Sequence, residues 1–366
     1  MTERLRVGVI GCGLIAQVMH LHYLRELSDR YEIAAVCDLS PEVRDACARE
    51  YNVPAQYEKW QDLVAHPLDA VFVLTSGSHA PAAIAAAQAG RHVLVEKPMC
   101  FSVAEGKEMI EAASAAGKTL MVAYNKRYDP AYRRLLEKSK ELDDLRLVRI
   151  TTLESPIEPY VRHYNLRKGV PLAPELADSL TRDNQARIKA AIGDVDELSR
   201  WAYHAVLLDS LVHELNAMRG ALGEPDELQW ADIRETGLTA VFRYGKTQVV
   251  LLWVDLPDIA RYSMEFAFYT PKRRMILSFP SPFLRSAPTL FSDETGTPRY
   301  AETQRTEEVV SYEESFKQEL IHFHECANTG KQPVTSAQDT LHDIALCAAV
   351  VDVHRTHKPR ARPSQP

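Results

Sequence analysis

Residues 5–16 read LRVGVIGCGLIA, an apolar run that leads into a glycine-rich turn. The run is typical of a buried strand, and the stretch that follows it, to about Leu27, has the pattern of a helix. Gly11 allows a tight turn, Gly13 lets the backbone approach a phosphate, and Ala16 keeps the helix close to the strand. The start of a helix also presents backbone N–H groups to an anion. The spacing therefore predicts a loop that holds the pyrophosphate of a dinucleotide.

Asp38 ends the next apolar run, EIAAVCD at residues 32–38. An acid at this strand end accepts hydrogen bonds from the hydroxyls of an adenosine ribose. Leu39 follows it, where an arginine often supports a 2′-phosphate, and this favours NAD over NADP; Arg44 is the nearby residue that argues against it. The alternative is a plain strand–helix turn with a solvated aspartate.

The same alternation of strand and helix continues to about residue 125. Further strands are expected at 69–75, 92–97 and 119–125, and helices at 41–50, 80–89 and 102–116. Continuous apolar runs bounded by Gly, Asp and Pro are typical of a parallel sheet buried on both faces. Residues 1–125 are therefore predicted to form an α/β Rossmann domain with a doubly wound parallel sheet.

The pattern changes in residues 126–366, where alternating strands are joined by short turns. After a helix that ends near Leu142, strands are expected at 146–154, 238–245, 247–255, 261–270 and 273–280, and long helices at 174–191, 194–222, 312–328 and 336–356. Alternation and short turns indicate antiparallel pairing. We expect an α+β domain with a largely antiparallel open sheet that binds substrate and mediates oligomerisation, its last helices packing back on the first domain.

Composition narrows the class of protein. The chain has 366 residues, 46% hydrophobic and 25% charged, enough for two globular domains. With 43 basic and 50 acidic residues, a net charge of −7 and no long basic run, nucleic acid and anionic membranes are not expected as partners. No apolar stretch is long enough for a membrane span, and charges at the amino terminus argue against a signal peptide. Six scattered cysteines are expected to be reduced thiols, so we predict a cytoplasmic protein.

Glu96-Lys97-Pro98 closes the strand at 92–97, at the sheet edge where doubly wound proteins bind ligands. A lysine there can contact the nicotinamide end of a cofactor or a substrate oxygen. The alternative is a surface lysine before a proline that starts a helix.

Asp209 and His213 are separated by one helical turn, so they share a helix face, and Asn216 extends that polar strip. Another face carries a predicted core stripe of Leu208, Leu211, Leu215, Met218 and Leu222. Taken alone, the polar strip could equally be a solvated face.

Together these motifs resemble the Gfo/Idh/MocA family of glucose-fructose oxidoreductase and inositol dehydrogenase relatives. The matching stretches are GVIGCGLIA, VLTSGSHAPAAIAAAQAGRHVLVEKP, AYNKRYDPAY and ELIHFHECANTGKQPVTSAQDTLHDIALCAAV. The resemblance covers most of the chain except about 156–200 and 280–305. It implies NAD as cofactor, hydride transfer to or from a carbohydrate or cyclitol hydroxyl, and a homodimer or homotetramer.

The resemblance also implies roles for single residues. His213 would take the proton of the substrate hydroxyl, Lys97 would hydrogen-bond the reacting oxygen, and Asp209 would orient the substrate or the imidazole. Cofactor contacts are expected from Gly11, Gly13, Leu14, Ile15, Asp38, Thr75, Ser76, His79, Glu96, Lys97 and Asn125. One departure is the presence of leucines at 207, 208 and 211, where the family usually has small glycines.

Substrate contacts are expected from Lys97, Lys126, Arg127, Asp209 and His213, and from the segment 156–200. Arg162, His163 and Tyr164 combine aromatic rings with hydrogen-bonding groups, which suits a glycoside or another substrate larger than a bare monosaccharide. The alternative is that the segment is a surface excursion that packs or bridges subunits.

Three functions remain open at this point. The first is an NAD-dependent dehydrogenase of a sugar, sugar derivative or cyclitol. The second is a redox-neutral glycosidase or lyase that oxidises a sugar carbon transiently and takes the hydride back. The third is a non-catalytic NAD-binding regulator. The pairs His20-x-His22 and His322-x-His324 fall in helical segments, where their side chains point to different faces, so no metal site is expected.

Overall fold

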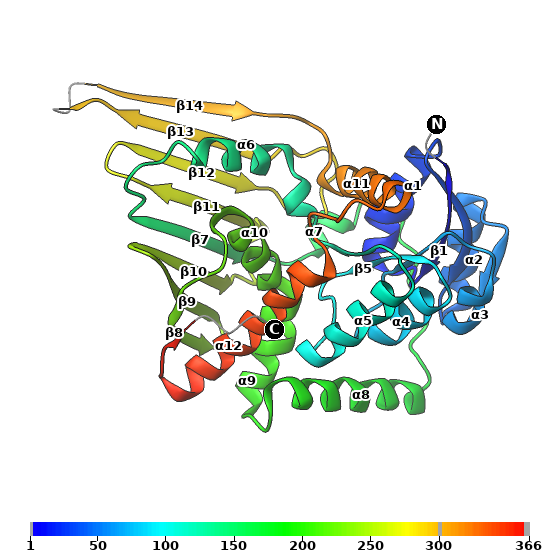
Figure 1. Cartoon of the computed structure of the whole chain (residues 1–366). Coiled ribbons are helices and arrows are strands. Elements are labelled where there is room, and N and C mark those ends of the chain that lie inside the picture. The colour runs from blue at the N-terminus through cyan, green and yellow to red at the C-terminus, as the bar shows by residue number, and fades with distance from the viewer. Residues whose placement is uncertain (1–2, 299–301, 362–366) are drawn as a thin grey trace. The chain divides into compact units, whose positions relative to one another are not determined.

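The computed structural model describes residues 3–298 and 302–361. They divide into two compact units, each discontinuous in sequence (Figure 1). Of these residues, the first unit contains 3–124, 163–194 and 316–345, and the second contains 125–162, 195–298, 302–315 and 346–361. In the described part of the chain, no helix is both long and apolar enough to cross a membrane.

The first unit is built on a six-stranded sheet with strand order β3-β2-β1-β4-β5-β6, in which all neighbours are parallel. Its strands are β1 (Leu5–Ile10), β2 (Tyr31–Cys37), β3 (Ala55–Tyr57), β4 (Ala70–Val73), β5 (His92–Glu96) and β6 (Leu120–Ala123). Every residue of β4 and β6 is buried, as expected for strands covered on both faces. The predicted Rossmann architecture is confirmed.

Helices follow most of these strands. They are η1 (Ala16–His20), α1 (Leu21–Glu26), α2 (Pro41–Tyr51), α3 (Trp60–Ala65), α4 (Ala80–Gln88) and α5 (Val103–Ala115), with α8 (Pro174–Ile192) and α11 (Ser315–Thr329) from later in the chain. Two starts are fixed by local side chains. Ser40 accepts a hydrogen bond from the N–H of Val43, and Ser102 and Glu105 form a reciprocal capping box at α5. These caps set where the loops at the carboxyl ends of β2 and β5 finish.

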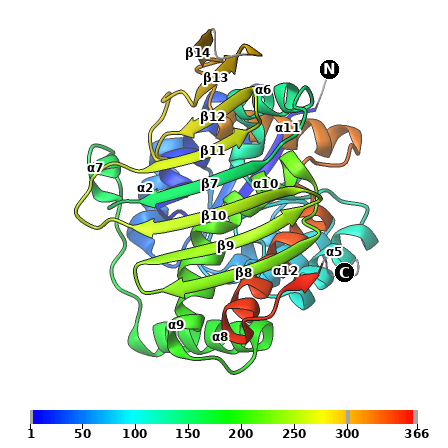
Figure 2. The same cartoon turned by 90° about the vertical axis from the view of Figure 1, so that its left-hand side faces the viewer.

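The second unit contains a nine-stranded sheet with the order β14-β13-β12-β11-β7-β10-β9-β8-β15 (Figure 2). Its strands are β7 (Leu147–Glu154), β8 (Glu227–Arg234), β9 (Gly237–Tyr244), β10 (Thr247–Asp255), β11 (Ser263–Tyr269), β12 (Arg273–Phe279), β13 (Leu290–Gly296), β14 (Thr303–Val309) and β15 (Arg360–Ala361). All neighbours are antiparallel except β7 and β10, which run parallel. The predicted largely antiparallel sheet is confirmed.

The two faces of this sheet differ in burial. In β10, Val249, Leu251 and Trp253 are buried, whereas Val250 and Leu252 between them are half-buried. The buried face is covered by α6 (Pro130–Ser139), which contacts β12 and β13, and by α10 (Val212–Leu222), which hydrogen-bonds to β7. The other face therefore carries apolar side chains that are only partly covered in this chain.

The remaining helices of the second unit are η2 (Asn125–Tyr128), α7 (Glu158–Val161), α9 (Glu197–Trp201) and η3 (Ala202–Leu211). α12 (Ala337–Thr356) contributes residues to both units. α9, η3 and α10 follow one another without a break, where the sequence predicts one helix over 194–222. The difference is that η3 is π-helical, so its turns are wider than those of the predicted α-helix.

Candidate active site

The loop after β1 is shaped by Gly11. Its backbone has φ +92°, and its N–H donates to the carbonyl of Cys37, 2.8 Å away. A Cβ at Gly11 would lie 2.9 Å from the backbone carbon of Leu74 and from the backbone nitrogen of Thr75. The position therefore requires glycine, both for its left-handed backbone and for the close approach of β4.

Gly13, unlike Gly11, borders open space. A Cβ built there meets no heavy atom within 4 Å, so open space borders the loop at this point. Leu14 and Ile15 start the helical segment and are half-buried, and Ala16 is buried. The loop thus leaves room beside the first turn of a helix, the arrangement that suits a pyrophosphate.

Asp38 is fixed at the carboxyl end of β2. Its carboxylate accepts hydrogen bonds from the backbone N–H groups of Cys12 (2.8 Å) and Ser40 (2.9 Å). Arg44, which the sequence left as a competing signal, donates to the carbonyl oxygen of Asp38 at 2.9 Å. The carboxylate is therefore held beside the glycine loop by backbone groups, with lone pairs left for further hydrogen bonds.

His79 links two loops at the same sheet edge. Its ring lies 2.7 Å from the carbonyl of Thr75, in the loop after β4, and 2.7 Å from the carbonyl of Pro98, in the loop after β5. Burial lowers the pKa of His79, and the two hydrogen bonds oppose that shift. Ser76 in the same loop is exposed. The imidazole thus holds together the two loops that carry the predicted cofactor contacts Thr75, Ser76 and Lys97.

Glu96 and His20 form a buried pair beneath Lys97. His20 Nε2 and Glu96 Oε1 are 2.7 Å apart, and the N–H of Lys97 donates to the other carboxylate oxygen at 3.0 Å. Burial raises the pKa of Glu96, but the hydrogen bond and charge of His20 and the charge of Lys97 outweigh it, so the pKa is lowered. Sequence reasoning weighed His20 only as a metal ligand and missed this contact, because the two residues are 76 positions apart.

Glu319 of α11 is a second buried carboxyl group in this unit. Its carboxylate oxygens have no hydrogen-bond partner among the described residues. Burial raises the pKa of Glu319 well above its ordinary value, and the negative charge of Glu96 adds to the shift. A proton on Glu319 is therefore favoured while Glu96 is ionised.

The predicted catalytic pair lies in the second unit. Asp209, in the last part of η3, is exposed, and His213, in the first turn of α10, is half-buried. The expected core stripe is confirmed for Leu208, Leu211, Leu215 and Met218, all buried, whereas Leu222 is half-buried. The pair spans a junction between π- and α-helical turns, and π-helical segments are frequent at functional sites.

A polar cluster adjoins this helix, and of its members only Tyr160 falls in the segment 156–200 that the sequence assigns to substrate binding. Ser210 donates to Glu154 at 3.2 Å, where Glu154 ends β7. The N–H of Tyr262 donates to the hydroxyl of Tyr160 at 2.6 Å, and burial, with the charges of Glu214 and Glu154, raises the pKa of Tyr262 well above its ordinary value. Ser210, Glu154 and Tyr262 come from separate elements or loops, so no local pattern indicates that they meet.

Next to His213, Glu214 is fully buried and accepts a hydrogen bond from Thr152 at 2.7 Å. Burial raises the pKa of Glu214, and the charge of buried Lys126 acts against that shift. Lys126, predicted as a substrate contact, thus lies near this buried carboxyl group.

Two other predicted residues hold the same unit together. Asn125 donates to Ser315 at 2.8 Å, and Arg127 donates to the carbonyl of Asn216 at 3.2 Å. Arg127 and Tyr132 lie where a side chain at Gly220 would have to be. Asn125 belongs to the second unit, whereas the other predicted cofactor contacts belong to the first.

Arg162, His163 and Tyr164 lie at the boundary between the two units. Arg162 is an exposed residue of the second unit, whereas His163 and Tyr164 belong to the first unit, with ring centroids 4.2 Å apart. Their proposed role in substrate binding remains a prediction.

Comparison with known proteins agrees with this geometry. Residues 5–124 match the family model described as "Oxidoreductase family, NAD-binding Rossmann fold", that of Gfo/Idh/MocA. This match identifies residues 5–124 as a Gfo/Idh/MocA NAD-binding domain. The resemblance predicted from the motifs is confirmed for these residues.

Relatives extend beyond the matched domain. An uncharacterized oxidoreductase of Bacillus subtilis, YrbE, is 23% identical over 350 residues, which cover 93% of this chain and 92% of that protein. Inositol 2-dehydrogenase of Salmonella typhimurium is 28% identical over 165 residues, which cover 44% of this chain and 46% of that enzyme. The similarity to the named inositol dehydrogenase thus spans less than half of its length.

Solved structures share the fold of this chain. Levoglucosan dehydrogenase in complex with NADH has a TM-score of 0.75 at 17% sequence identity, covering 99% of this chain and 100% of that one. An oxidoreductase from Agrobacterium radiobacter, in complex with NAD⁺, L-tartaric acid and magnesium, has a TM-score of 0.72 at 16% identity, with 98% of each chain covered. At these identities the likeness concerns architecture.

Proposed function

We propose that this protein is an NAD-dependent oxidoreductase that transfers hydride between a nicotinamide cofactor and a hydroxyl group of a sugar, sugar derivative or cyclitol. The observation that carries the proposal is the cradle made by Gly11, Gly13 and Asp38, which offers a tight turn, open space and a fixed carboxylate at one sheet edge. The relatives named as inositol 2-dehydrogenase support the substrate class.

The residues of the first unit fit a dinucleotide. The open space at Gly13 suits a pyrophosphate, and the carboxylate of Asp38 suits the adenosine ribose. When bound, NAD⁺ would supply the hydride acceptor. We assign preference for NAD over NADP because the charge on Asp38 repels a 2′-phosphate, and Arg44 is hydrogen-bonded to the backbone carbonyl of Asp38.

The proposed chemistry uses the chain's own titratable groups. His213 accepts the proton of the substrate hydroxyl, because imidazole titrates close to neutral pH. Lys97 stabilises the negative charge that develops on the same oxygen. Asp209 orients the substrate or the imidazole.

The polar cluster of the second unit supports a polyhydroxylated substrate. Glu154 is hydrogen-bonded to Ser210, which directly follows Asp209. Tyr160 and Tyr262 adjoin it and add aromatic surface and hydroxyl groups. Carboxylate, hydroxyl and aromatic groups together recognise sugar rings by hydrogen bonding and stacking.

The test is a panel of polyols, sugars and glycosides offered with NAD⁺, followed by NADH absorbance and by product analysis. We expect NADH to accumulate with a sugar or cyclitol, and His213→Ala and Lys97→Ala to lower turnover at least about 10²-fold. The dissociation constant of NADH should change little in His213→Ala. Near-normal turnover in that variant would remove His213 from the mechanism.

The panel also separates the alternatives. A redox-neutral glycosidase or lyase would form product without net NADH, and a regulator would bind NADH with no product from any compound. Either result would replace the dehydrogenase assignment.

A further inference from the structure

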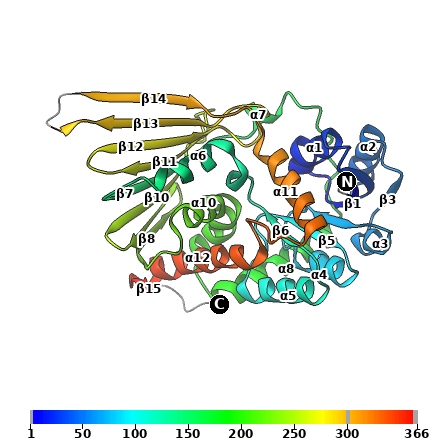
Figure 3. The same ribbon diagram turned by 45° about the horizontal axis from the view of Figure 1, so that its top comes forward.

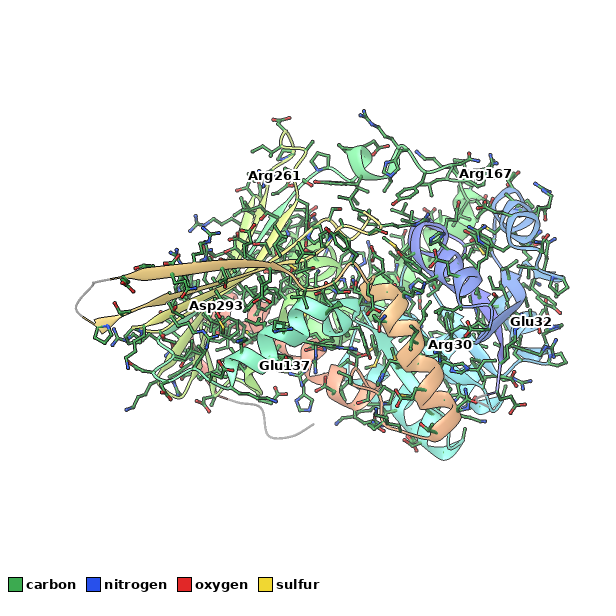
Figure 4. All side chains as sticks on the ribbon, turned by 90° about the horizontal axis from the view of Figure 1, so that it is seen from above. Arg30, Glu32, Glu137, Arg167, Arg261 and Asp293 are labelled. Atoms are coloured by element: carbon green, nitrogen blue, oxygen red, sulfur yellow. The ribbon has the colours of Figure 1, made fainter. Side chains whose placement is uncertain are left out.

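Residues 163–192 run along the first unit and are attached near the glycine loop. The backbone N–H of Arg167 donates to Gln17 Oε1 at 2.8 Å, and Gln17 Nε2 donates back to the carbonyl of Arg167 at 3.0 Å. The same Gln17 amide donates to the carbonyl of Cys12 at 2.8 Å. Gln17 therefore joins the glycine loop directly to this segment, and Figure 4 shows Arg167 beside the blue amino-terminal elements.

The segment also touches the loop that carries Asp38. A Cβ at Gly169 would lie 2.8 Å from both Cβ and Oγ of Ser40, the N-cap of α2. Any larger residue at 169 would push the segment away from this loop. Glycine is therefore used here for close backbone approach to the ribose side of the predicted cofactor site.

A second attachment lies on the other half of the sheet edge. In α8, Asn184 packs against Gly77, which has a φ of +88°. A Cβ built on Gly77 would lie 3.2 Å from Asn184 Oδ1, so there is little space between the two residues. Arg187 forms an ion pair with Glu105, and Glu105 accepts a hydrogen bond from Ser78 at 3.0 Å. Figures 1 and 3 show α8 alongside α4 and α5, as these contacts require.

The two attachments lie on opposite sides of the point where the strand order reverses. The first is at the loops after β1 and β2, and the second is at the loop after β4, while β1 and β4 are neighbours in the sheet. A dinucleotide in such a fold binds across that point, at the carboxyl ends of the strands. Residues 170–183 therefore span the position of the dinucleotide.

The spanning part is apolar and uncovered by the described chain. Val170 is 60% exposed, Leu172 38%, Leu176 39% and Leu180 44%. Leu180 and Leu176 stand one and two turns before Asn184, so they share the helix face that Asn184 turns toward Gly77. Arg167 and Lys168 come just before the spanning part, at the first attachment, and their charge suits an anionic ligand.

We propose that residues 163–192 form a strap that closes over the bound dinucleotide and completes its site. The proposal rests on the proposed function, since its ligand is the NAD cofactor. The strap adds an apolar wall to the cradle of Gly11, Gly13 and Asp38, and brings Arg167 and Lys168 to its first attachment. Release of the cofactor then requires the Arg187–Glu105 and Gln17–Arg167 attachments to open, so release is slow.

The test measures NADH release from the full-length protein. Protein loaded with NADH is mixed with excess NAD⁺, and the fall of NADH fluorescence gives the dissociation rate. Arg187→Gln removes one attachment, and Lys189→Gln is the matched control, because Lys189 lies on the same helix and pairs with exposed Asp194 at 2.7 Å. We expect release to be about five- to tenfold faster in Arg187→Gln, as for the loss of a charge-assisted hydrogen bond, and unchanged in Lys189→Gln.

A second measurement needs no variant. Trypsin should cut after exposed Lys168 more slowly when NAD⁺ is present, while cutting after exposed Lys246 in the β9–β10 turn stays the same. Equal release rates in both variants, or equal protection at both sites, would overturn the strap while leaving dinucleotide binding intact. If the wild-type protein binds no dinucleotide at all, the proposed function fails and the strap fails with it.

Discussion

Glu319 offers a quantitative test of the electrostatics beneath Lys97. The carboxyl group is fully buried, has no hydrogen-bond partner among the described residues, and faces the charge of Glu96, which is paired with His20. Its pKa is therefore raised well above 4.5 in the folded protein. An acid with a raised folded pKa binds its proton more tightly in the folded state. The stability it supports is present at low pH and is lost as pH rises from the unfolded pKa toward the folded one.

The size of the effect follows from linkage. Each pH unit between the two pKa values removes about 1.4 kcal/mol from the free energy of unfolding. A neutral amide in place of the acid keeps the burial and removes this dependence. We therefore expect Glu319→Gln to gain stability relative to the wild type as pH rises above about 4.5, by up to about 1.4 kcal/mol per pH unit until the folded pKa of Glu319 is reached.

The assay is urea unfolding of the ligand-free protein at several pH values, followed by tryptophan fluorescence. Glu325→Gln is the control on the same helix, because Glu325 is solvent-facing and pairs with Lys331 at 3.1 Å. That ion pair lowers the pKa of Glu325, so its contribution is constant above about pH 5.5 and is lost only in acid. A stability difference for Glu319→Gln that does not grow with pH would show that Glu319 is ionised in the folded protein, and the burial argument would be wrong.

Three further predictions concern the cradle and the sheet. Gly11→Ala should weaken NADH binding at least about tenfold in a fluorescence titration, because its Cβ would lie 2.9 Å from backbone atoms of Leu74 and Thr75, just after β4, and its φ is positive. In steady-state kinetics, kcat/KM should favour NAD⁺ over NADP⁺, and Asp38→Ala should reduce that preference at least about tenfold; a wild-type preference for NADP⁺ would contradict the role of Asp38. Light scattering should give a dimer or tetramer, and Leu252→Arg on the partly covered sheet face should shift the mass toward the monomer; a wild-type monomer would leave that face without the expected partner.

The sequence predicted the first sheet well because each of its main strands is locally recognisable. A strand buried on both faces must be apolar throughout, and residues 70–73 and 120–123 satisfy this without reference to the rest of the chain. β3 was missed because three half-exposed or exposed residues carry no periodicity.

The strands missed in the second sheet have specific physical reasons. β14 reads TQRTEEV and is almost wholly exposed, so it is held by backbone pairing with β13 and shows no alternation. In β8 a bulge between Leu228 and Trp230 shifts the register, so that Leu228, Ala231 and Ile233 are buried at uneven spacing. A period-two pattern cannot describe such a strand.

In the candidate site, too, some residues are recognisable from the local sequence and others are not. Gly11, Asp38 and Lys97 could be found because each occupies a fixed place in a strand–turn–helix motif. The contact of His20 with Glu96 and that of Gln17 with Arg167 join residues 76 and 150 positions apart. Contacts of this kind depend on tertiary packing, and nothing in a local pattern records them.

The strap gives a kinetic means of choosing between the dehydrogenase and its redox-neutral alternative. A dehydrogenase must release NADH in every cycle, so its turnover cannot exceed the rate at which NADH leaves. An enzyme that returns the hydride to its substrate has no such limit. If the attachments at Gln17 and Arg187 make release slow, the two cases separate clearly. Product formation faster than NADH release would require the hydride to return within the site, whereas turnover at or below the release rate, accelerated in Arg187→Gln, would identify cofactor release as the rate-limiting step of a dehydrogenase.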